Sequence, residues 1–196
     1  MPCGPDVPRS PYASYVHAAY IKDHRTPGVD FATLHIWPKN WGWYDEKDKS
    51  RGLDQALLQA GDYLAVHEGY ARQLRMPLLL EEFGFPRNGG ACEPGTRTSL
   101  RDEFYQVMLD AAVRGAAAGG PLAGALFWGW GGEGRPREKN RNRCGAGGPP
   151  AVWQRGDALL SDPPHESQGW YSVFDSDAST LDVLKRAAAK ANALAG

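Results

Sequence analysis

The stretch Leu78–Pro86, with the sequence LLLEEFGFP, limits the fold more than any other part of the chain. Three leucines run directly into two glutamates, and Gly84 and Pro86 then interrupt the run. An apolar run of this length between breaker residues is typical of a strand of a parallel sheet that is buried on both faces. Such sheets place their chemistry at the carboxyl ends of their strands, which is where Glu81 and Glu82 stand.

Side chains alternate between the two faces of a strand. Leu78, Leu80 and Glu82 are therefore expected on one face, and Leu79 and Glu81 on the other. One of the two glutamates should then face a ligand. For a single glutamate a solvated strand end would be the simpler interpretation, but two other stretches of the chain favour a functional one.

Those two stretches, 29–37 (VDFATLHIW) and 122–130 (LAGALFWGW), are also predicted to be strands. The helical periodicity predicts helices at about 13–23, 53–76, 99–118 and 179–194. Ser99 with Asp102, and the segment 179–182, are expected to cap the last two helices. Strands that alternate with long helices predict parallel βα units with right-handed crossovers, and therefore an α/β fold.

Further predictions concern the domain, the loops and the cysteines. The 196 residues suffice for one domain with a core. Residues 1–12 are expected to form an irregular lead-in, and 131–168 a long loop rich in Gly, Pro and Arg. Three cysteines cannot all pair within one chain. Cys92 and Cys144 follow neighbouring predicted strands and are predicted to pair, with Cys3 free; three unrelated thiols are the alternative.

Composition excludes several classes of function. Lys and Arg number 22 against 23 Asp and Glu, without a basic block, so binding to nucleic acid is not indicated. No apolar run is long enough for a membrane span, and the first residues do not have the pattern of a signal peptide. The GxSxG, HExxH and P-loop motifs are absent. His165-Glu166 has no third ligand at a suitable spacing, so neither a metal nor a cofactor is predicted.

Each predicted strand ends in side chains that suit sugar chemistry. The first ends in His35 and Trp37, the second in Glu82 and the third in Trp128. Taken singly, His35 would more often be a structural histidine and Trp128 a core residue. Three such ends in succession favour a site, in which a carboxylate attacks an anomeric carbon and aromatic rings pack on the apolar face of a sugar.

The segments 29–45 (VDFATLHIWPKNWGWYD), 77–87 (PLLLEEFGFPR) and 120–136 (GPLAGALFWGWGGEGRP) resemble the C-terminal part of the glycoside hydrolase family 5 endo-1,4-β-mannosidases, or mannanases. The segment 168–184 (QGWYSVFDSDASTLDVL) resembles the last loop and helix of that family. The resemblance implies a (β/α)8 TIM barrel, of which this chain holds about the last three βα units, strands six to eight. It also implies a retaining mechanism on β-1,4-mannan, glucomannan or galactomannan.

The resemblance also assigns residues. Glu82 corresponds to the family's nucleophile, His35 and Trp37 to its His-x-Tyr motif, and Trp128 to its platform tryptophan. Trp37 stands where the family has a tyrosine that hydrogen-bonds the nucleophile. The residues expected to contact the substrate are His35, Trp37, Trp41, Trp128, Trp130, Glu133 and Arg135.

The family's acid/base, the Glu of an Asn-Glu pair, has no counterpart, because the sequence contains no Asn-Glu dipeptide. A complete barrel has typically ~250 residues. Residues 1–196 are therefore expected to form a single incomplete barrel domain without activity of its own: a truncated product, a fragment or a wrongly assigned start. The alternatives are a non-catalytic mannan-binding remnant and a β-1,4-glucanase of the same clan. The resemblance favours a secreted protein; no oligomeric state is predicted.

Overall fold

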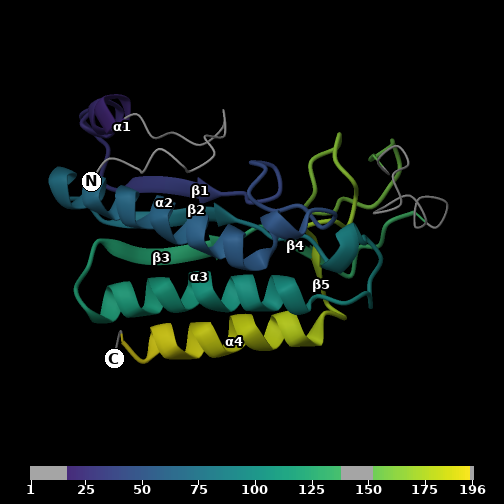
Figure 1. Cartoon of the computed structure of the whole chain (residues 1–196). Coiled ribbons are helices and arrows are strands. Elements are labelled where there is room, and N and C mark those ends of the chain that lie inside the picture. Colours follow the sequence, from purple (N-terminus) through teal and green to yellow (C-terminus); the bar gives the residue numbers. More distant parts are fainter. Residues whose placement is uncertain (1–16, 138–151, 195–196) are drawn as a thin grey trace.

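Three parallel strands organise the computed structural model, which describes residues 17–137 and 152–194 (Figure 1). They are β1 (Ala32–Ile36), β2 (Leu78–Phe83) and β3 (Leu122–Phe127), side by side in the order β1-β2-β3. The predicted order and direction of the strands are confirmed. The lead-in 1–12 and part of the expected loop 131–168 lie outside the described residues.

The third strand is shorter than predicted. It ends at Phe127, and Trp130 instead begins β4 (Trp130–Gly132). This strand pairs in parallel with β5 (Val173–Phe174) in a separate two-stranded sheet. The prediction that Trp130 continues the strand of Trp128 is therefore wrong, because the chain changes sheets between the two tryptophans.

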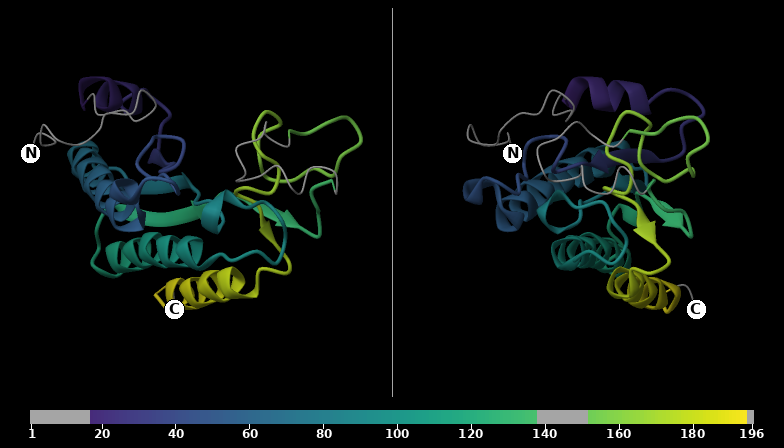
Figure 2. Two further views of the ribbon diagram at one scale, coloured as in Figure 1. Left: turned by 45° about the vertical axis from the view of Figure 1, so that its right-hand side comes forward. Right: turned by 90° about the vertical axis from the view of Figure 1, so that its right-hand side faces the viewer.

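The described residues form four α-helices: α1 (His17–His24), α2 (Leu53–Leu74), α3 (Ser99–Ala117) and α4 (Ala178–Asn192). Short 3-10 helices, η1 (Lys49–Arg51) and η2 (Asn88–Gly90), lie in the connecting loops. Figures 1 and 2 show α3 between β3 and α4, and α1 on the opposite side of the molecule. No described helix is both long and apolar enough to cross a bilayer.

The main core lies between one face of the sheet and the helices α2 and α3. Buried strand residues at every second position of β1, namely Ala32, Leu34 and Ile36, pack in one cluster with buried helix residues. The helices contribute mainly Ala56, Ala60, Tyr63, Leu64, Phe104, Tyr105 and Met108. The spacing of these residues is close to the 3.6-residue period that predicted the helices.

Alternation along β2 breaks at its carboxyl end. Leu78 and Leu80 are fully buried in the core, and Phe83, rather than Glu82, is the next buried residue. The pairing with β1 shifts by one residue here, from Leu34–Leu80 to His35–Glu82, so that Glu81 has no partner in β1. Because of this irregularity, a β-bulge, the prediction that Glu82 shares a face with Leu78 and Leu80 is wrong.

The predicted helix caps are also wrong. Ser99 is already the first residue of α3, and its hydroxyl accepts a hydrogen bond from the side chain of Asn88. Asp102 accepts hydrogen bonds from the hydroxyls of Thr98 and Thr180, at 3.1 and 2.5 Å. The Asp102 carboxylate therefore links α3 to the start of α4 instead of pairing with Ser99. In α4 the N-cap is Asp177 and not a residue of the segment 179–182.

Two buried arginines, Arg87 and Arg101, hold the loop before α4 against the core. Both are 0% exposed. Arg87 donates through both terminal nitrogens to Asp177, whose side chain is almost fully buried. Arg101 donates to the carbonyl oxygens of Phe85, Trp170 and Ser172 at 2.7–3.0 Å. Each guanidinium loses its water on burial, and these acceptors replace most of that water; only Nε of Arg87 has no hydrogen-bond partner among the described residues.

The helix α1 covers the outer edge of β1. The hydroxyl of Tyr20 donates to the carbonyl oxygen of Thr33 at 2.9 Å, and the backbone N–H of Thr33 donates to Nε2 of His24 at 3.5 Å. Tyr20 also packs against His24 and against Tyr70 of α2. Side chains thus satisfy backbone groups that would otherwise form an open strand edge.

We expect Asp177→Ala to lower the free energy of unfolding by about 3–5 kcal/mol, because it leaves Arg87 buried without its charged partner. Asp175→Ala is the matched control: it removes the pair with Arg135, whose side chains are 43% and 36% exposed, and should change stability by less than about 1 kcal/mol. Urea denaturation followed by circular dichroism measures both. Equal midpoints for the two variants would contradict a stabilising role of the buried pair.

Cys92 is buried and disulfide-bonded. Cys3 and Cys144 lie outside the described residues, so the pairing of Cys92 with Cys144 stays a prediction. Peptide mapping without reductant should recover one cross-linked peptide pair that contains these two cysteines. A peptide pair that joins Cys92 to Cys3 would show the prediction to be wrong.

Candidate active site

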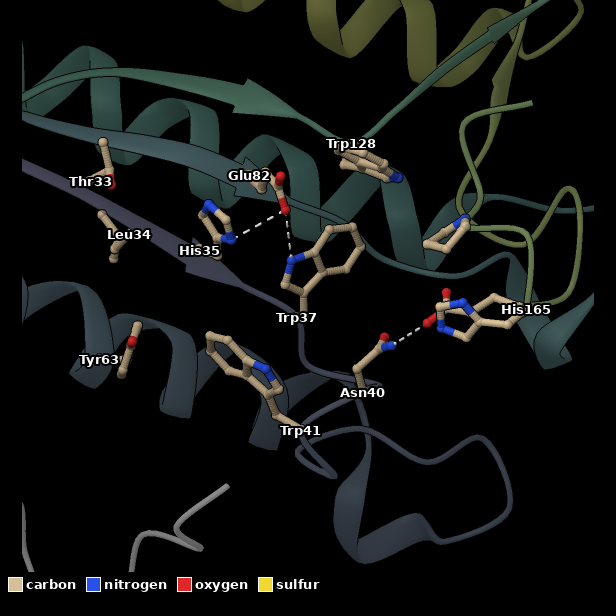
Figure 3. Close-up of a pocket in the computed structure, with 12 residues that line it drawn as sticks. Thr33, Leu34, His35, Trp37, Asn40, Trp41, Tyr63, Glu82, Trp128 and His165 are labelled. Carbon is tan, nitrogen blue, oxygen red and sulfur yellow. Dashed lines mark hydrogen bonds and ion pairs between the residues drawn. The ribbon is translucent and has the colours of Figure 1, made fainter. Parts of the chain in front are cut away.

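A cavity of about 760 Å³ opens at the carboxyl ends of β1 and β2 (Figure 3). Five of the residues that were predicted to act on a substrate line it, namely His35, Trp37, Trp41, Glu82 and Trp128. They come from two strands and from the loops that follow β1 and β3. The expected convergence of His35, Glu82 and Trp128 on one cleft is therefore observed.

Glu82 lies in this cavity with its side chain 28% exposed. Its Oε2 atom accepts a hydrogen bond from the indole Nε1–H of Trp37 at 3.3 Å. The same oxygen lies 3.2 Å from Nδ1 of His35. An indole can donate but not accept, so Trp37 can supply the hydrogen bond to the carboxylate that the family's tyrosine would supply.

His35 stands between two carboxylates. Its Nε2 atom lies 3.2 Å from Oε2 of Glu81, on the side opposite to the contact with Glu82. An imidazole donates through both nitrogens only when it is protonated. Glu81 can therefore orient His35, and the β-bulge that leaves Glu81 unpaired in the sheet brings it to this position.

Aromatic rings form the wall of the cavity. Trp37 packs edge to face against Trp128 and Tyr171, at centroid distances of 6.0 and 5.0 Å. Trp41 packs in the same way against Tyr63. These contacts hold the indoles in place, and flat apolar surfaces of this kind suit the apolar face of a sugar ring.

The far end of the cavity is polar. The side-chain amide of Asn40 donates to Oε1 of Glu166 at 2.9 Å, and its oxygen accepts a hydrogen bond from the hydroxyl of Tyr171. Burial raises the pKa of the Glu166 carboxyl, and the hydrogen bond from Asn40 opposes that shift. His165, also on the cavity wall, is exposed.

Sequence reasoning missed this group. It considered His165 and Glu166 only as metal ligands and did not consider Asn40. The partners Asn40 and Glu166 are 126 residues apart in the chain, and no local pattern connects them. Among the described residues, no group of three or more His, Cys, Asp or Glu side chains is placed to hold a metal ion.

Three predicted contact residues, Trp130, Glu133 and Arg135, are not among the residues that line this cavity. Trp130 is 58% exposed in β4. Arg135 donates to the carbonyl oxygens of Gly132 and Gly134 and to Asp175, and its guanidinium lies over the ring of Phe174. These contacts give Arg135 a structural role around β4 and β5.

Gly84 makes room for Trp37. A Cβ atom at this position would lie 2.5 Å from Cζ3 of Trp37, 3.1 Å from Tyr171 and 3.2 Å from the carbonyl oxygen of Trp128. Gly84→Ala should therefore displace the indole from Glu82 and destabilise the fold by about 1–3 kcal/mol. The tryptophan emission spectrum and the urea midpoint together measure both effects.

The matched control for Gly84→Ala is Gly69→Ala, on the exposed side of α2. A Cβ atom at Gly69 would meet nothing within 4 Å. Alanine should therefore stabilise the helix there by roughly 0.5–1 kcal/mol. A tolerated Gly84→Ala with unchanged emission would show that this close approach does not position Trp37.

Among proteins of known sequence, the chain is similar to plant enzymes. It is 37% identical over 120 residues to mannan endo-1,4-beta-mannosidase 3 of Oryza sativa subsp. japonica, a match that covers 61% of this chain and 24% of that protein. It is 34% identical over 117 residues to mannan endo-1,4-beta-mannosidase 3 of Arabidopsis thaliana, covering 59% and 26%. The matched part thus spans about a quarter of the length of these curated relatives.

Among solved structures, the glycoside hydrolase family 5 mannosidase of Rhizomucor miehei is similar over 93% of this chain and 42% of its own, with a TM-score of 0.77 and 32% identity. The endo-1,4-beta-D-mannanase of Thermotoga petrophila has a TM-score of 0.52 at 20% identity, which is a likeness of fold alone. The family 5 neighbours imply a (β/α)8 barrel, of which the described residues form a part.

A family model described as "GH family 5 beta-mannosidase-like" matches residues 11–195, nearly the whole chain. The match includes all three strands of the main sheet and every residue that lines the cavity. The chain therefore belongs to the β-mannosidase-like proteins of glycoside hydrolase family 5.

Proposed function

We propose that this chain is the carboxyl-terminal part of a retaining glycoside hydrolase that cleaves β-1,4-mannosidic bonds, with Glu82 as its nucleophile. The observation that carries this proposal is the position of Glu82, at the end of β2 and on the wall of an aromatic cavity, with two nitrogen atoms directed at one of its oxygens. This arrangement supports a carboxylate that is held for attack on an anomeric carbon.

The contacts of Glu82 indicate how the attack would proceed. His35 and Trp37 both lie against Oε2, so Oε1 is the atom that would form the bond to the anomeric carbon. Breaking that bond later returns negative charge to the carboxylate, which the hydrogen bond from Trp37 and the nearby Nδ1 of His35 would stabilise. Trp37 and Trp128 would pack against the sugar and keep its anomeric carbon within reach of Glu82.

The second carboxyl group is proposed to come from outside this chain. A retaining enzyme needs an acid/base about 5–5.5 Å from the nucleophile. The sequence has no Asn-Glu dipeptide, which is where the family carries this residue. The chain covers 42% of the length of its similar solved structure. We therefore assign β1, β2 and β3 to strands six to eight of the barrel, and expect the missing units to supply the acid.

The proposed substrate is a β-1,4-mannan, glucomannan or galactomannan. The plant relatives are named mannan endo-1,4-beta-mannosidases, and one structure of the Rhizomucor miehei mannosidase holds mannosyl-fructose. Hydrolysis of such a wall or storage polysaccharide would take place outside the cell, so we propose that the complete protein is secreted.

A second candidate function is mannan binding without catalysis. It is favoured by the aromatic wall of Trp37, Trp41 and Trp128 in a chain that lacks the Asn-Glu pair. A binding remnant and an enzyme part differ in one respect: only the enzyme part gains hydrolysis when the missing barrel units are restored.

The test compares the 196-residue chain with an extended chain, in which the preceding units of a family 5 mannanase are fused to its amino terminus. We expect no release of manno-oligosaccharides from locust-bean galactomannan by the short chain, and release by the extended one. Glu82→Ala in the extended chain should lower the rate by at least about 10³-fold. Glu103→Ala, which removes an exposed carboxyl on α3, is the control and should leave the rate unchanged.

Two results would contradict parts of this proposal. Release by the short chain, abolished by Glu82→Ala, would show that an acid/base is present within the 196 residues. An extended chain that binds mannan but does not hydrolyse it would favour the binding remnant. Parallel assays on carboxymethylcellulose would detect a β-1,4-glucanase.

A further inference from the structure

Glu81 and Glu82 are neighbours in β2, and both contact the same side chain. The pairing of β2 with β1 shifts at this point, so that His35 pairs with Glu82 and Glu81 has no partner in β1. Oε2 of Glu81 lies 3.2 Å from Nε2 of His35, and Oε2 of Glu82 lies 3.2 Å from Nδ1 of the same ring. Regular alternation would turn two successive side chains to opposite faces of the strand. At the bulge, one imidazole thus stands between two successive carboxylates.

The His35 ring is held by these two contacts. Its side chain is 41% exposed, and elsewhere in the part of the chain that the structure describes it makes no hydrogen bond, ion pair or aromatic ring contact. Trp37, by contrast, packs edge to face against Trp128. Figure 3 shows His35 and Trp37 directed at the same oxygen of Glu82. Packing therefore fixes one of the two groups at this oxygen, whereas Glu81 is placed to fix the other.

An imidazole has two orientations of nearly equal shape. A half-turn about χ2 exchanges Nδ1 with Cδ2 and Nε2 with Cε1, and a partly exposed ring has little packing to oppose it. In the turned ring, carbon atoms would face both Glu81 and Glu82. The contact at Nε2 therefore keeps Nδ1 of His35, and not a carbon, beside Oε2 of Glu82.

The proposed reaction changes the charge on Glu82 but not on Glu81. In the first step Oε1 of Glu82 would bond to the anomeric carbon, while the bond to the leaving oxygen breaks and that oxygen takes a proton from the acid/base of the missing units. Glu82 is then a neutral ester, which attracts His35 less. In the second step water attacks the same carbon and gives a proton to the acid/base, and the electron pair of the broken bond returns to Glu82. Glu81 reacts in neither step and can hold the ring throughout.

This difference determines which step should depend on Glu81. An interaction accelerates a step only if it is stronger in the transition state than in the state before it. Negative charge leaves Glu82 in the first step and returns to it in the second. A donor held beside Oε2 of Glu82 therefore favours the second step and gives no advantage to the first.

We propose that Glu81 is a positioning residue for hydrolysis of the covalent intermediate: it holds His35 so that Nδ1 meets the negative charge that returns to Oε2 of Glu82. This inference rests on the proposed function. It assigns a role to a carboxylate that the sequence marked only as a neighbour of the nucleophile. It also gives the β-bulge a function, because the bulge is where Glu81 reaches the ring.

The test uses the extended chain and a 4-nitrophenyl glycoside of β-1,4-mannobiose. Nitrophenolate leaves readily, so kcat reports the second step and kcat/KM the first. We expect Glu81→Leu, which removes the acceptor for Nε2 of His35, to lower kcat about tenfold to a hundredfold and to leave kcat/KM within about threefold. Glu81→Gln keeps an oxygen acceptor and should recover most of kcat. Glu103→Leu, at an exposed position on α3, is the matched control and should leave both constants unchanged.

A second comparison shows whether Glu81 acts through His35. In a His35→Ala background, Glu81→Leu should lower kcat no further, because there is no ring left to position. An equal fall in kcat in both backgrounds would show that Glu81 acts independently of His35, and the inference would be wrong.

The position of the ring can be measured without turnover, in the 196-residue chain labelled with ¹⁵N in histidine and tryptophan. Long-range ¹H–¹⁵N spectra resolve Nδ1 and Nε2 of His35. Glu81→Leu should shift both of these resonances and the indole N–H resonance of Trp37, whereas Glu103→Leu should shift none of them. Equal thermal midpoints for the wild type and Glu81→Leu would show that the change is local.

The outcomes are distinct. A fall in kcat with a preserved kcat/KM, recovered by Glu81→Gln and absent in the His35→Ala background, supports the inference. Wild-type kinetics for Glu81→Leu, equal falls in kcat and kcat/KM, or unchanged resonances of His35 would overturn it while the proposed function stands. An extended wild type that releases no nitrophenolate would contradict the proposed function, and this inference with it.

Discussion

A parallel sheet is stable only when both of its faces and both of its edges are covered, and this requirement governs the rest of the structure. Helices α2 and α3 cover one face, where the buried residues of all three strands pack. At the edge strand β3, Leu126 is more than half exposed. An apolar groove of about 630 Å³ also runs along β3 beside α3 and α4. One face of the sheet is therefore covered by helices, whereas the edge at β3 has an apolar groove against which further βα units could pack.

Several residues of the cavity wall lie in loops, and buried polar contacts hold the loop before β5 in place. Arg87, Arg101, Asp162 and Asp177 together bind the backbone from Trp170 to Phe174. That backbone ends at β5 and places Tyr171 beneath Trp37. Because charged groups without water need several acceptors or donors each, these contacts specify one loop conformation more strictly than apolar packing would. The position of the cavity wall thus depends on residues that no substrate would touch.

Much of the fold could be predicted from local patterns. The apolar runs and the helical period placed the three strands, their direction and the four helices, because burial imposes those periods directly. The convergence of His35, Glu82 and Trp128 followed from the geometry of parallel strands. The β-bulge at Glu81 did not follow, because strict alternation assumes a register that only the pairing with β1 reveals. The same holds for Trp130, since nothing in the run LAGALFWGW marks the point where the chain changes sheets.

The polar end of the cavity illustrates a second limit. Nothing in the sequence around Asn40 or Glu166 marks either residue as functional. Their position in the cavity wall becomes evident only when the fold brings the two loops together. Arg135 shows the converse, because a motif that resembled a sugar contact instead holds β4 against the segment after β5. Local composition identified the strand ends, whereas the tertiary fold alone determined which loop residues joined them.

Because α1 contacts β1, the two edges of the sheet are not equally accessible to another strand. At β1, the backbone groups of Thr33 are already bonded to Tyr20 and His24. Another strand can pair there only after those bonds open and α1 moves aside. Along β3 a new strand would meet an apolar groove instead. A strand added at β1 would therefore have to displace α1, whereas a strand added at β3 would have no such contact to break.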